Sequence, residues 1–319
     1  METKVLHIKE NLRKPEYFVY IILAVMFTVA VIASPGYLQR AHMSGLLKTA
    51  SFLGIAAIGQ TFAILLGDID LSVANTITLG NVLGAQILMG SDANLGKAFV
   101  IILLAGILIG AGNGFGIRYL KLDPFIMTLG MSSVIEGVFM IYTQGAPKGK
   151  TSPFMSSLCR SAGTGVVTGV FLIWIVLVVI AIFVMKKTTF GRNVFAVGAN
   201  KTAARFSGIN TTKIYFIVYI ISAVLAIFAG FLLVGYTGTS YLDVGVDYND
   251  NSIAAVIIGG TAVTGGRGGY LGTLAGVMLM VMLVDFLTIV NISEAGRQMI
   301  QGGIIIILLL LYNRDKASH

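Results

Sequence analysis

The sequence predicts an all-α, polytopic membrane protein with about ten transmembrane helices, and three observations support this fold class. Only 11% of the 319 residues are charged and 56% are hydrophobic, whereas a soluble domain has about 25% charged residues. The mean hydropathy is +0.89. Apolar runs of about 20 residues, the length that spans a bilayer as a helix, recur along the chain. Because no long polar segment separates them, residues 1–319 are expected to form one transmembrane domain.

Ten segments are expected to span the membrane. Eight runs are clear from their length and hydrophobicity: 17–33, 47–66, 98–117, 125–142, 166–185, 214–235, 270–290 and 298–311. Two further segments are weaker, because residues 71–89 are rich in small side chains and residues 251–259 are short and run into glycines. The two halves of the chain could form an inverted repeat, as in many transporters.

The distribution of basic residues predicts that both termini lie in the cytoplasm. When the ten segments alternate from a cytoplasmic N-terminus, 15 of the 22 Lys and Arg residues fall inside and 7 fall outside. This excess agrees with the positive-inside rule. The net charge of +8 is therefore topological, and no basic-aromatic surface indicates nucleic-acid binding. The three histidines are scattered, so no metal site is expected.

The loop of residues 186–213 is long, polar and basic for a chain of this kind. It holds six of the 15 inner positive charges. Within it, Asn200 is a good helix N-cap and Gly208 is a good C-terminal cap, so "KTAARFS" predicts a short helix with small residues at Ala203 and Ala204. A helix of about two turns is unstable alone and needs its own membrane domain or a partner to pack on. A loop that only follows the positive-inside rule is the alternative.

The same stretch carries a resemblance to a known family. The segment "TTFGRNVFAVGANKTAARFSGIN" resembles the cytoplasmic coupling segment of permease subunits of ribose-type sugar ABC importers, the binding-protein-dependent transport system inner membrane component family. Three other segments resemble that family in the same order: "GDIDLSV" (67–73), "PFIMTLGM" (124–131) and "IAAVIIGGTAVTGGRGGYLGTLAG" (253–276). The resemblance covers nearly the whole chain.

The resemblance implies that this chain is a bacterial inner-membrane transport subunit and not an enzyme. A separate ATP-binding subunit would carry ATP and Mg, a periplasmic or lipid-anchored protein would deliver a pentose or hexose, and a second permease, identical or a close paralogue, would complete the pathway. The short helix would dock on the ATPase. The residues that the resemblance assigns to coupling are Gly191, Arg192, Gly198, Asn200, Ala203, Ala204, Arg205, Ser207 and Gly208.

The glycine run "GGTAVTGGRGG" (259–269) has part of the spacing of a phosphate-binding loop. That motif requires Lys and Ser or Thr after its last glycine, but Gly266 and Arg267 follow Gly265 here. The run is therefore expected to form a tight cytoplasmic turn between two spans. ATP binding is expected on another polypeptide.

Polar residues at membrane depth are functional candidates by default. Asp68 and Asp70 flank a break between the second and third spans, and Glu136 and Asp285 fall inside spans. They could line a path for a hydroxyl-rich substrate, cap helices, or bind ions in a secondary transporter, which is the alternative function. Many relatives have an Arg-Gly pair where Glu136 and Gly137 stand here. The pathway candidates, for which helix packing is the other interpretation, are Gln60, Asp70, Ser72, Asn75, Asn113, Glu136, Asn251 and Ser252.

Overall fold

The computed structural model describes residues 15–160 and 165–317, and the regular elements in these ranges are helices. In chain order they are α2 (Pro15–Ala33), α3 (Arg40–Leu65), α4 (Val73–Leu88), the 3-10 turn η1 (Asp92–Asn94), α5 (Leu95–Arg118), α6 (Pro124–Thr143), α7 (Pro153–Arg160), α8 (Gly169–Lys187), α9 (Thr189–Ala199), α10 (Lys201–Phe206), α11 (Thr211–Thr237), α12 (Val246–Ile258), α13 (Tyr270–Ile289) and α14 (Glu294–Ala317).

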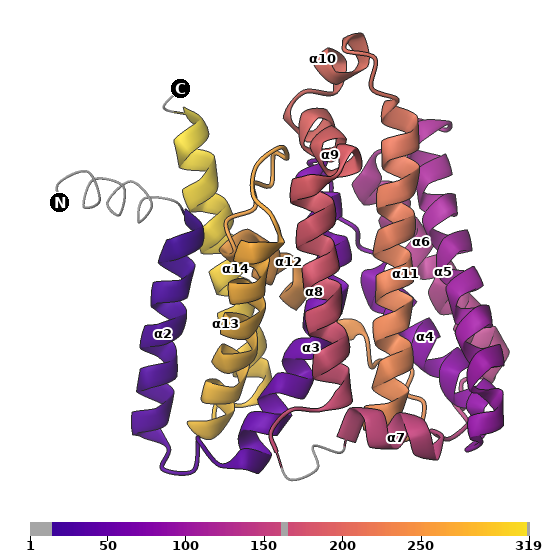
Figure 1. Ribbon diagram of the computed structural model, residues 1–319, viewed down its shortest axis with the longest axis vertical. Helices are drawn as coiled ribbons and strands as arrows, with labels where there is room; N and C mark the ends of the chain where they lie inside the picture. Colours follow the sequence, from indigo (N-terminus) through magenta and orange to yellow (C-terminus); the bar gives the residue numbers. More distant parts are fainter. Residues whose placement is uncertain (1–14, 161–164, 318–319) are drawn as a thin grey trace.

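The long helices stand side by side and alternate in direction (Figure 1). The short helices α9 and α10 lie at one end of the bundle, which we call the α10 end. The short helix α7 lies at the opposite end, the α7 end. The beginning of α2 and the end of α14 both lie toward the α10 end. Lys4, Lys9, Arg13 and Lys14, which contribute to the predicted inner charge, lie outside the described residues.

Each of the ten predicted segments contains a helix, and within the residues that the structure describes six of these helices are long and apolar enough to cross a membrane. Helix α4 and the part of α2 at residues 19–33 are shorter apolar helices, and α12 has only 13 residues. Helix α3 begins at Arg40 rather than at residue 47 as predicted, because its first turns carry polar side chains that hydropathy alone leaves out. The structure therefore confirms an all-helical polytopic fold, while the number of ten membrane crossings stays a prediction.

Helix α11 packs against α3, α4 and α5 through glycines. The α5 residues Gly106, Gly110 and Gly114 are spaced by four, so they share one face of the helix, and that face lies on α11. A Cβ atom on Gly110 would stand 2.4 Å from the Cα of Ile220. Small residues at this spacing allow the close helix approach that membrane bundles use. The glycines of residues 110–116 therefore serve helix packing.

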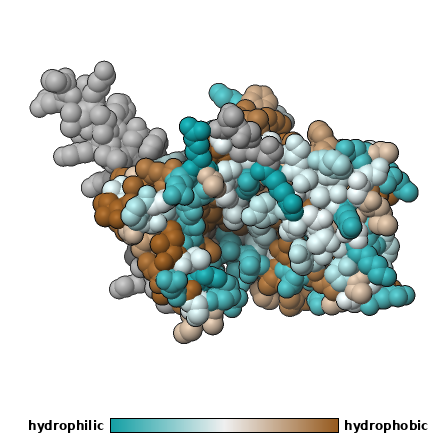
Figure 2. All heavy atoms as spheres, turned by 90° about the horizontal axis from the view of Figure 1, so that it is seen from below, coloured by the Kyte–Doolittle hydropathy of each residue, from teal (hydrophilic) through white to brown (hydrophobic). Residues whose placement is uncertain are grey.

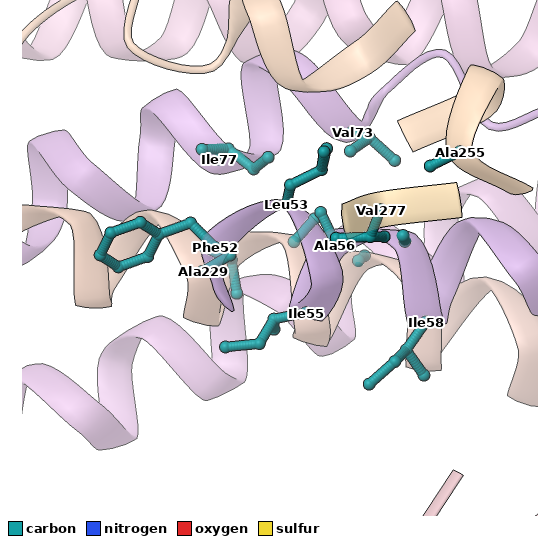
Figure 3. Packing of buried hydrophobic residues seen from close by; sticks show 14 of the residues in the cluster. Phe52, Leu53, Ile55, Ala56, Ile58, Val73, Ile77, Ala229, Ala255 and Val277 are labelled. Carbon is teal, nitrogen blue, oxygen red and sulfur yellow. The ribbon is translucent and has the colours of Figure 1, made fainter. Parts of the chain in front are cut away.

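Helix α3 is the most buried of the six long spans, with 83% of its apolar window inside the bundle, and α6 is the least, with 17%. Figure 3 shows α3 side chains such as Leu53 and Ala56 among residues of α4, α12 and α13, including Val73, Ala255 and Val277. On the end face opposite α10, hydrophilic residues spread over the middle and the right-hand margin, while hydrophobic residues gather mainly on the left and in smaller patches (Figure 2). The core is therefore centred on α3 and α11.

The predicted loop 186–213 is mostly helical. Helix α8 continues to Lys187, the eleven-residue helix α9 follows at once, and α11 begins at Thr211. The sequence did not predict α9, because its glycines at 191 and 198 resemble helix breakers. The Thr188 hydroxyl accepts a hydrogen bond from the backbone N–H of Gly191 and caps the start of α9.

Candidate functional site

The short helix α10 forms where the two cap residues predict it. The Asn200 Oδ1 atom accepts a 2.9 Å hydrogen bond from the backbone N–H of Ala203. After Ser207, Gly208 adopts a φ of +81°, and the N–H of Ile209 bonds back to the carbonyl of Ala204. These are the N-cap and left-handed C-terminal closure expected for a short helix.

The side chains of α10 divide between an inner and an outer face. Ala204 is only 4% exposed, so its methyl group packs on the protein's own domain and does not offer a small surface to the outside. Phe206 is 88% exposed, although a phenyl group at a helix end is normally covered. Arg192, Ala203, Arg205, Ser207 and Gly208 are also exposed. Phe206 was not among the predicted coupling residues, because the sequence did not indicate which face of α10 is covered.

The end of α9 is held against two membrane-domain loops at backbone distance. A Cβ atom on Gly198 would stand 1.8 Å from the carbonyl oxygen of Leu65 and 2.7 Å from the backbone nitrogen of Gly266. The Gly266 N–H also donates a 2.9 Å hydrogen bond to the same Leu65 carbonyl. Gly191 is similarly close to the carbonyls of α8. The α9–α10 segment is therefore fixed to the end of α3 and to the loop between α12 and α13.

The glycine run forms the tight turn that the sequence predicts. Gly260, Gly265, Gly266, Gly268 and Gly269 all have positive φ values, which glycine adopts without the steric cost of a Cβ atom. A Cβ atom on Gly266 would meet backbone atoms of Ala199, and one on Gly265 would meet the backbone nitrogen of Gly67. The turn thus lies against the end of α9 and against the linker between α3 and α4, which comprises residues 66–72.

Next to α10 lies a cavity of about 640 Å³ lined by basic and hydroxyl groups. We call it the basic cavity. Its lining residues are Arg118, Lys201, Thr202, Arg205, Phe206 and Thr211. Within it, Arg118 donates a 2.9 Å hydrogen bond to the Thr211 hydroxyl. The Arg118 guanidinium and the Lys201 ammonium lie 4.9 and 5.1 Å from the ring centroid of Tyr215.

The α3–α4 linker places a buried carboxylate next to Lys201, which lines this cavity. The Asp68 Oδ1 atom lies 3.6 Å from Lys201 Nζ, and its side chain is 4% exposed, against 50% for that of Lys201. The Tyr219 hydroxyl donates to Asp68 Oδ2 at 3.4 Å. Burial raises the pKa of Asp68 to about 6, and the Lys201 charge and the Tyr219 hydrogen bond oppose that rise. The sequence indicated a break at Asp68, but its partners are distant in the chain.

Asp70 is fully buried and forms the centre of a hydrogen-bond network. Its Oδ1 atom accepts from the backbone N–H and hydroxyl of Ser72, and its Oδ2 atom accepts from the Ser222 hydroxyl at 2.7 Å. The Asn113 amide donates to the Ser72 hydroxyl. Asp70 therefore closes the turn before α4, whose N-cap residue is Ser72. The network joins the linker to α5 and α11, which is a structural role.

A groove of about 860 Å³ runs along α6 and is lined by apolar side chains, such as Leu129 and Phe139, together with polar ones. We call it the α6 groove. Its polar lining residues are Asn75, Ser132, Glu136, Tyr241, Asp243, Asn249 and Asp250. The Asn75 amide donates at 3.0 Å to the Ser132 carbonyl and hydroxyl, and at 3.5 Å to Glu136. The carboxylates and amides offer the hydrogen-bonding groups that a hydroxyl-rich solute requires.

The eight predicted pathway residues do not share one cavity. Asn75 and Glu136 line the α6 groove. Asn251 lines a separate pocket of about 370 Å³, where His42 and Asp285 are 3.2 Å apart. Five others are buried inside the bundle, and they are Gln60, Asp70, Ser72, Asn113 and Ser252. The Ser252 hydroxyl bonds to the Asn249 carbonyl, so packing accounts for it.

Comparisons with known proteins agree with this architecture. The family described as branched-chain amino acid transport system, permease component, matches residues 42–309. The ribose import permease protein RbsC of Haemophilus influenzae is 32% identical over 92% of both chains. The galactose/methyl galactoside import permease protein MglC of Salmonella typhimurium is 30% identical over 92% of both chains.

A third relative is the inner membrane ABC transporter permease protein YjfF of Escherichia coli, which is 33% identical over 88% of this chain and 86% of its own. No solved structure matches the chain. The family match covers well over half of the chain, and the relatives match nearly its whole length. The chain therefore belongs to this family of transport-system permease components, as a multi-pass membrane subunit of the ABC transporter class.

Proposed function

We propose that the chain is the membrane-spanning permease of an ATP-driven bacterial importer for a monosaccharide of the ribose type, a pentose or hexose, in the inner membrane. Two relatives that align over 92% of this chain are named for ribose and galactose import. The substrate class rests on those names together with the carboxylates and amides that line part of the α6 groove. An ATPase subunit would carry ATP and Mg.

One observation supports the coupling role most strongly. Helix α10 presents a nearly fully exposed phenyl group at Phe206, while its neighbour α9 is fixed to two membrane-domain loops through Gly198. A protruding helix with a rigid base suits a partner that pushes or pulls on it. An ATPase subunit that receives Phe206 would therefore transmit its movement directly to the ends of α3, α12 and α13.

The α6 groove is the best candidate for half of the sugar pathway. Glu136 is an exposed carboxylate on a span that the rest of the chain scarcely covers, and a carboxylate facing lipid at membrane depth is costly. A second permease copy, identical or a close paralogue, would cover α6 and leave Glu136 in a wetted path. Gly130 and Gly137 leave open space on the same helix for that copy. A sugar-binding protein would deliver its cargo at the α7 end.

The ion-coupled alternative would use Asp70, Glu136 or Asp285 as a proton or cation site at membrane depth. Asp70 is buried and bonded to hydroxyls, Asp285 pairs with His42 in one pocket, and Glu136 lines another. These three groups lie in three separate environments without a shared relay. The geometry therefore favours coupling through α10.

Uptake assays distinguish the two functions. The tagged chain is purified from its native cells with its ATPase and reconstituted in liposomes that contain ATP and Mg, and the binding protein is added outside with labelled ribose or galactose. We expect uptake that needs both ATP and the binding protein and that survives a protonophore. Uptake that needs no ATP and stops with the protonophore would refute the proposal.

A further inference from the structure

The contact between α10 and the α3–α4 linker joins an exposed helix to the interior of the membrane domain. Lys201 is the first residue of α10, and its ammonium group is half exposed. Its partner Asp68 is almost completely buried. A buried carboxylate is tolerated while it is paired and hydrogen-bonded. The position of the linker therefore depends on a cation that belongs to the docking segment.

The two carboxylates of the linker bind the same stretch of α11. Asp68 accepts from Tyr219, and Asp70 accepts from Ser222, three residues further along that helix. Residues three apart in a helix share a face, so the two bonds hold the middle of the linker against one face of α11. From Asp70 the network continues through Ser72. A displacement at Asp68 would therefore reach the start of α4, the helix that carries Asn75 in the α6 groove.

Electrostatics makes this contact specific. The described residues that line the basic cavity include Arg118, Lys201 and Arg205 but no acid. Asp68 is thus the carboxylate within salt-bridge distance of Lys201, while the aromatic ring of Tyr215 lies near both Arg118 and Lys201. If α10 moves away, Asp68 loses the charge of Lys201.

We propose that Asp68 and Lys201 are the positioning pair through which movement of α10 resets the α3–α4 linker, and with it the α6 groove. This inference rests on the proposed docking role of α10. It assigns a function to two residues that the sequence analysis placed neither among the pathway candidates nor among the coupling residues. It also predicts that ATP hydrolysis and sugar uptake can be separated without loss of the ATPase.

The experiment compares four variants in the reconstituted complex: Asp68→Asn, Lys201→Met, the double variant and Lys201→Arg. Lys213→Met is the matched control, because Lys213 is an exposed cation at the start of α11 outside this contact. Three quantities are measured: the ATPase that co-purifies per permease, the rate of ATP hydrolysis, and the uptake of labelled ribose or galactose.

We expect each single neutral variant to retain the ATPase but to lower uptake per ATP at least about fivefold, within the range typical of coupling between sites. The double variant should lower uptake per ATP no further than the single variants, because each single change already removes the same Asp68–Lys201 contact. Lys201→Arg and Lys213→Met should be close to wild type. Lys201 is half exposed, so Lys201→Met decides the question even if Asp68→Asn does not fold.

Unchanged uptake per ATP in Lys201→Met, with the ATPase bound, would overturn the inference. Losses that add in the double variant would also overturn it. A wild-type complex that lacks an ATPase, or takes up neither sugar with ATP, would instead refute the proposed function, which is a separate result.

Discussion

Removal of the Phe206 side chain should weaken binding of the ATPase more than any other single truncation on α10. An aromatic side chain buries about 150–250 Å² in an interface, and Phe206 is 88% exposed in the free chain. About 180 Å² is then available, which at about 25 cal/mol per Å² gives an upper limit of about 4.5 kcal/mol. Interface anchors typically cost at least about 2 kcal/mol when truncated. Phe206→Ala should therefore raise the dissociation constant about 30- to 2,000-fold.

The assay immobilises the permease in nanodiscs and titrates the purified ATPase subunit. Alanine favours the helix, so loss of α10 would not explain the effect. Phe125→Ala is the matched control, because Phe125 is also an exposed aromatic residue, 52% accessible, near the start of α6. If Phe206→Ala changes the dissociation constant less than about threefold, or no more than the control, α10 does not dock through its exposed face.

Three further predictions concern stability and the pathway. Gly198→Ala places a methyl group 1.8 Å from a backbone carbonyl oxygen, so it should destabilise the protein by about 1–3 kcal/mol or more and lower its melting temperature in detergent. The control is Gly96→Ala, whose methyl group would meet nothing within 4 Å and should not lower the melting temperature. The pKa of Asp68 is raised from 3.8 to about 6, so the free energy of unfolding of wild type should fall by about 3 kcal/mol relative to that of Asp68→Asn as the pH rises through this window. In a Lys201→Met background the upper end of the window should move to higher pH. A difference in melting temperature that does not depend on pH would contradict this. Glu136→Gln keeps hydrogen-bonding groups, so uptake of a neutral sugar should fall no more than about tenfold, and complete loss would indicate that the charge itself is needed.

Local features could be predicted from the sequence, and features that depend on distant segments could not. The caps at Asn200 and Gly208 act within a few residues, so the residue types alone placed α10. The glycine run also specified its own turn. The Asp68–Lys201 pair joins segments 133 residues apart (201 − 68), and neither residue's neighbours in the sequence indicate the other.

The division of the pathway candidates depended on tertiary packing in the same way. Asn75 and Asn113 are both amides near the ends of their expected spans, and the sequence predicts the same pathway role for each. Only the arrangement of the helices shows that Asn75 lines the α6 groove while Asn113 is buried against Ser72. The exposure of Phe206 was missed for the same reason, since periodicity over six residues does not define a face.

The glycine contacts around α11 restrict how this protein can change shape. A Cβ atom on Gly80 of α4 or on Gly230 of α11 would stand 2.1 or 1.9 Å from a carbonyl oxygen of the other helix. Neither helix can therefore rotate, or shift by one residue, without a steric clash. Helices α4, α5 and α11 should therefore move together as one rigid body. Any alternation between inward-open and outward-open states should then occur at its margin, where α6 is sparsely packed and the proposed second permease copy would supply the opposing surface.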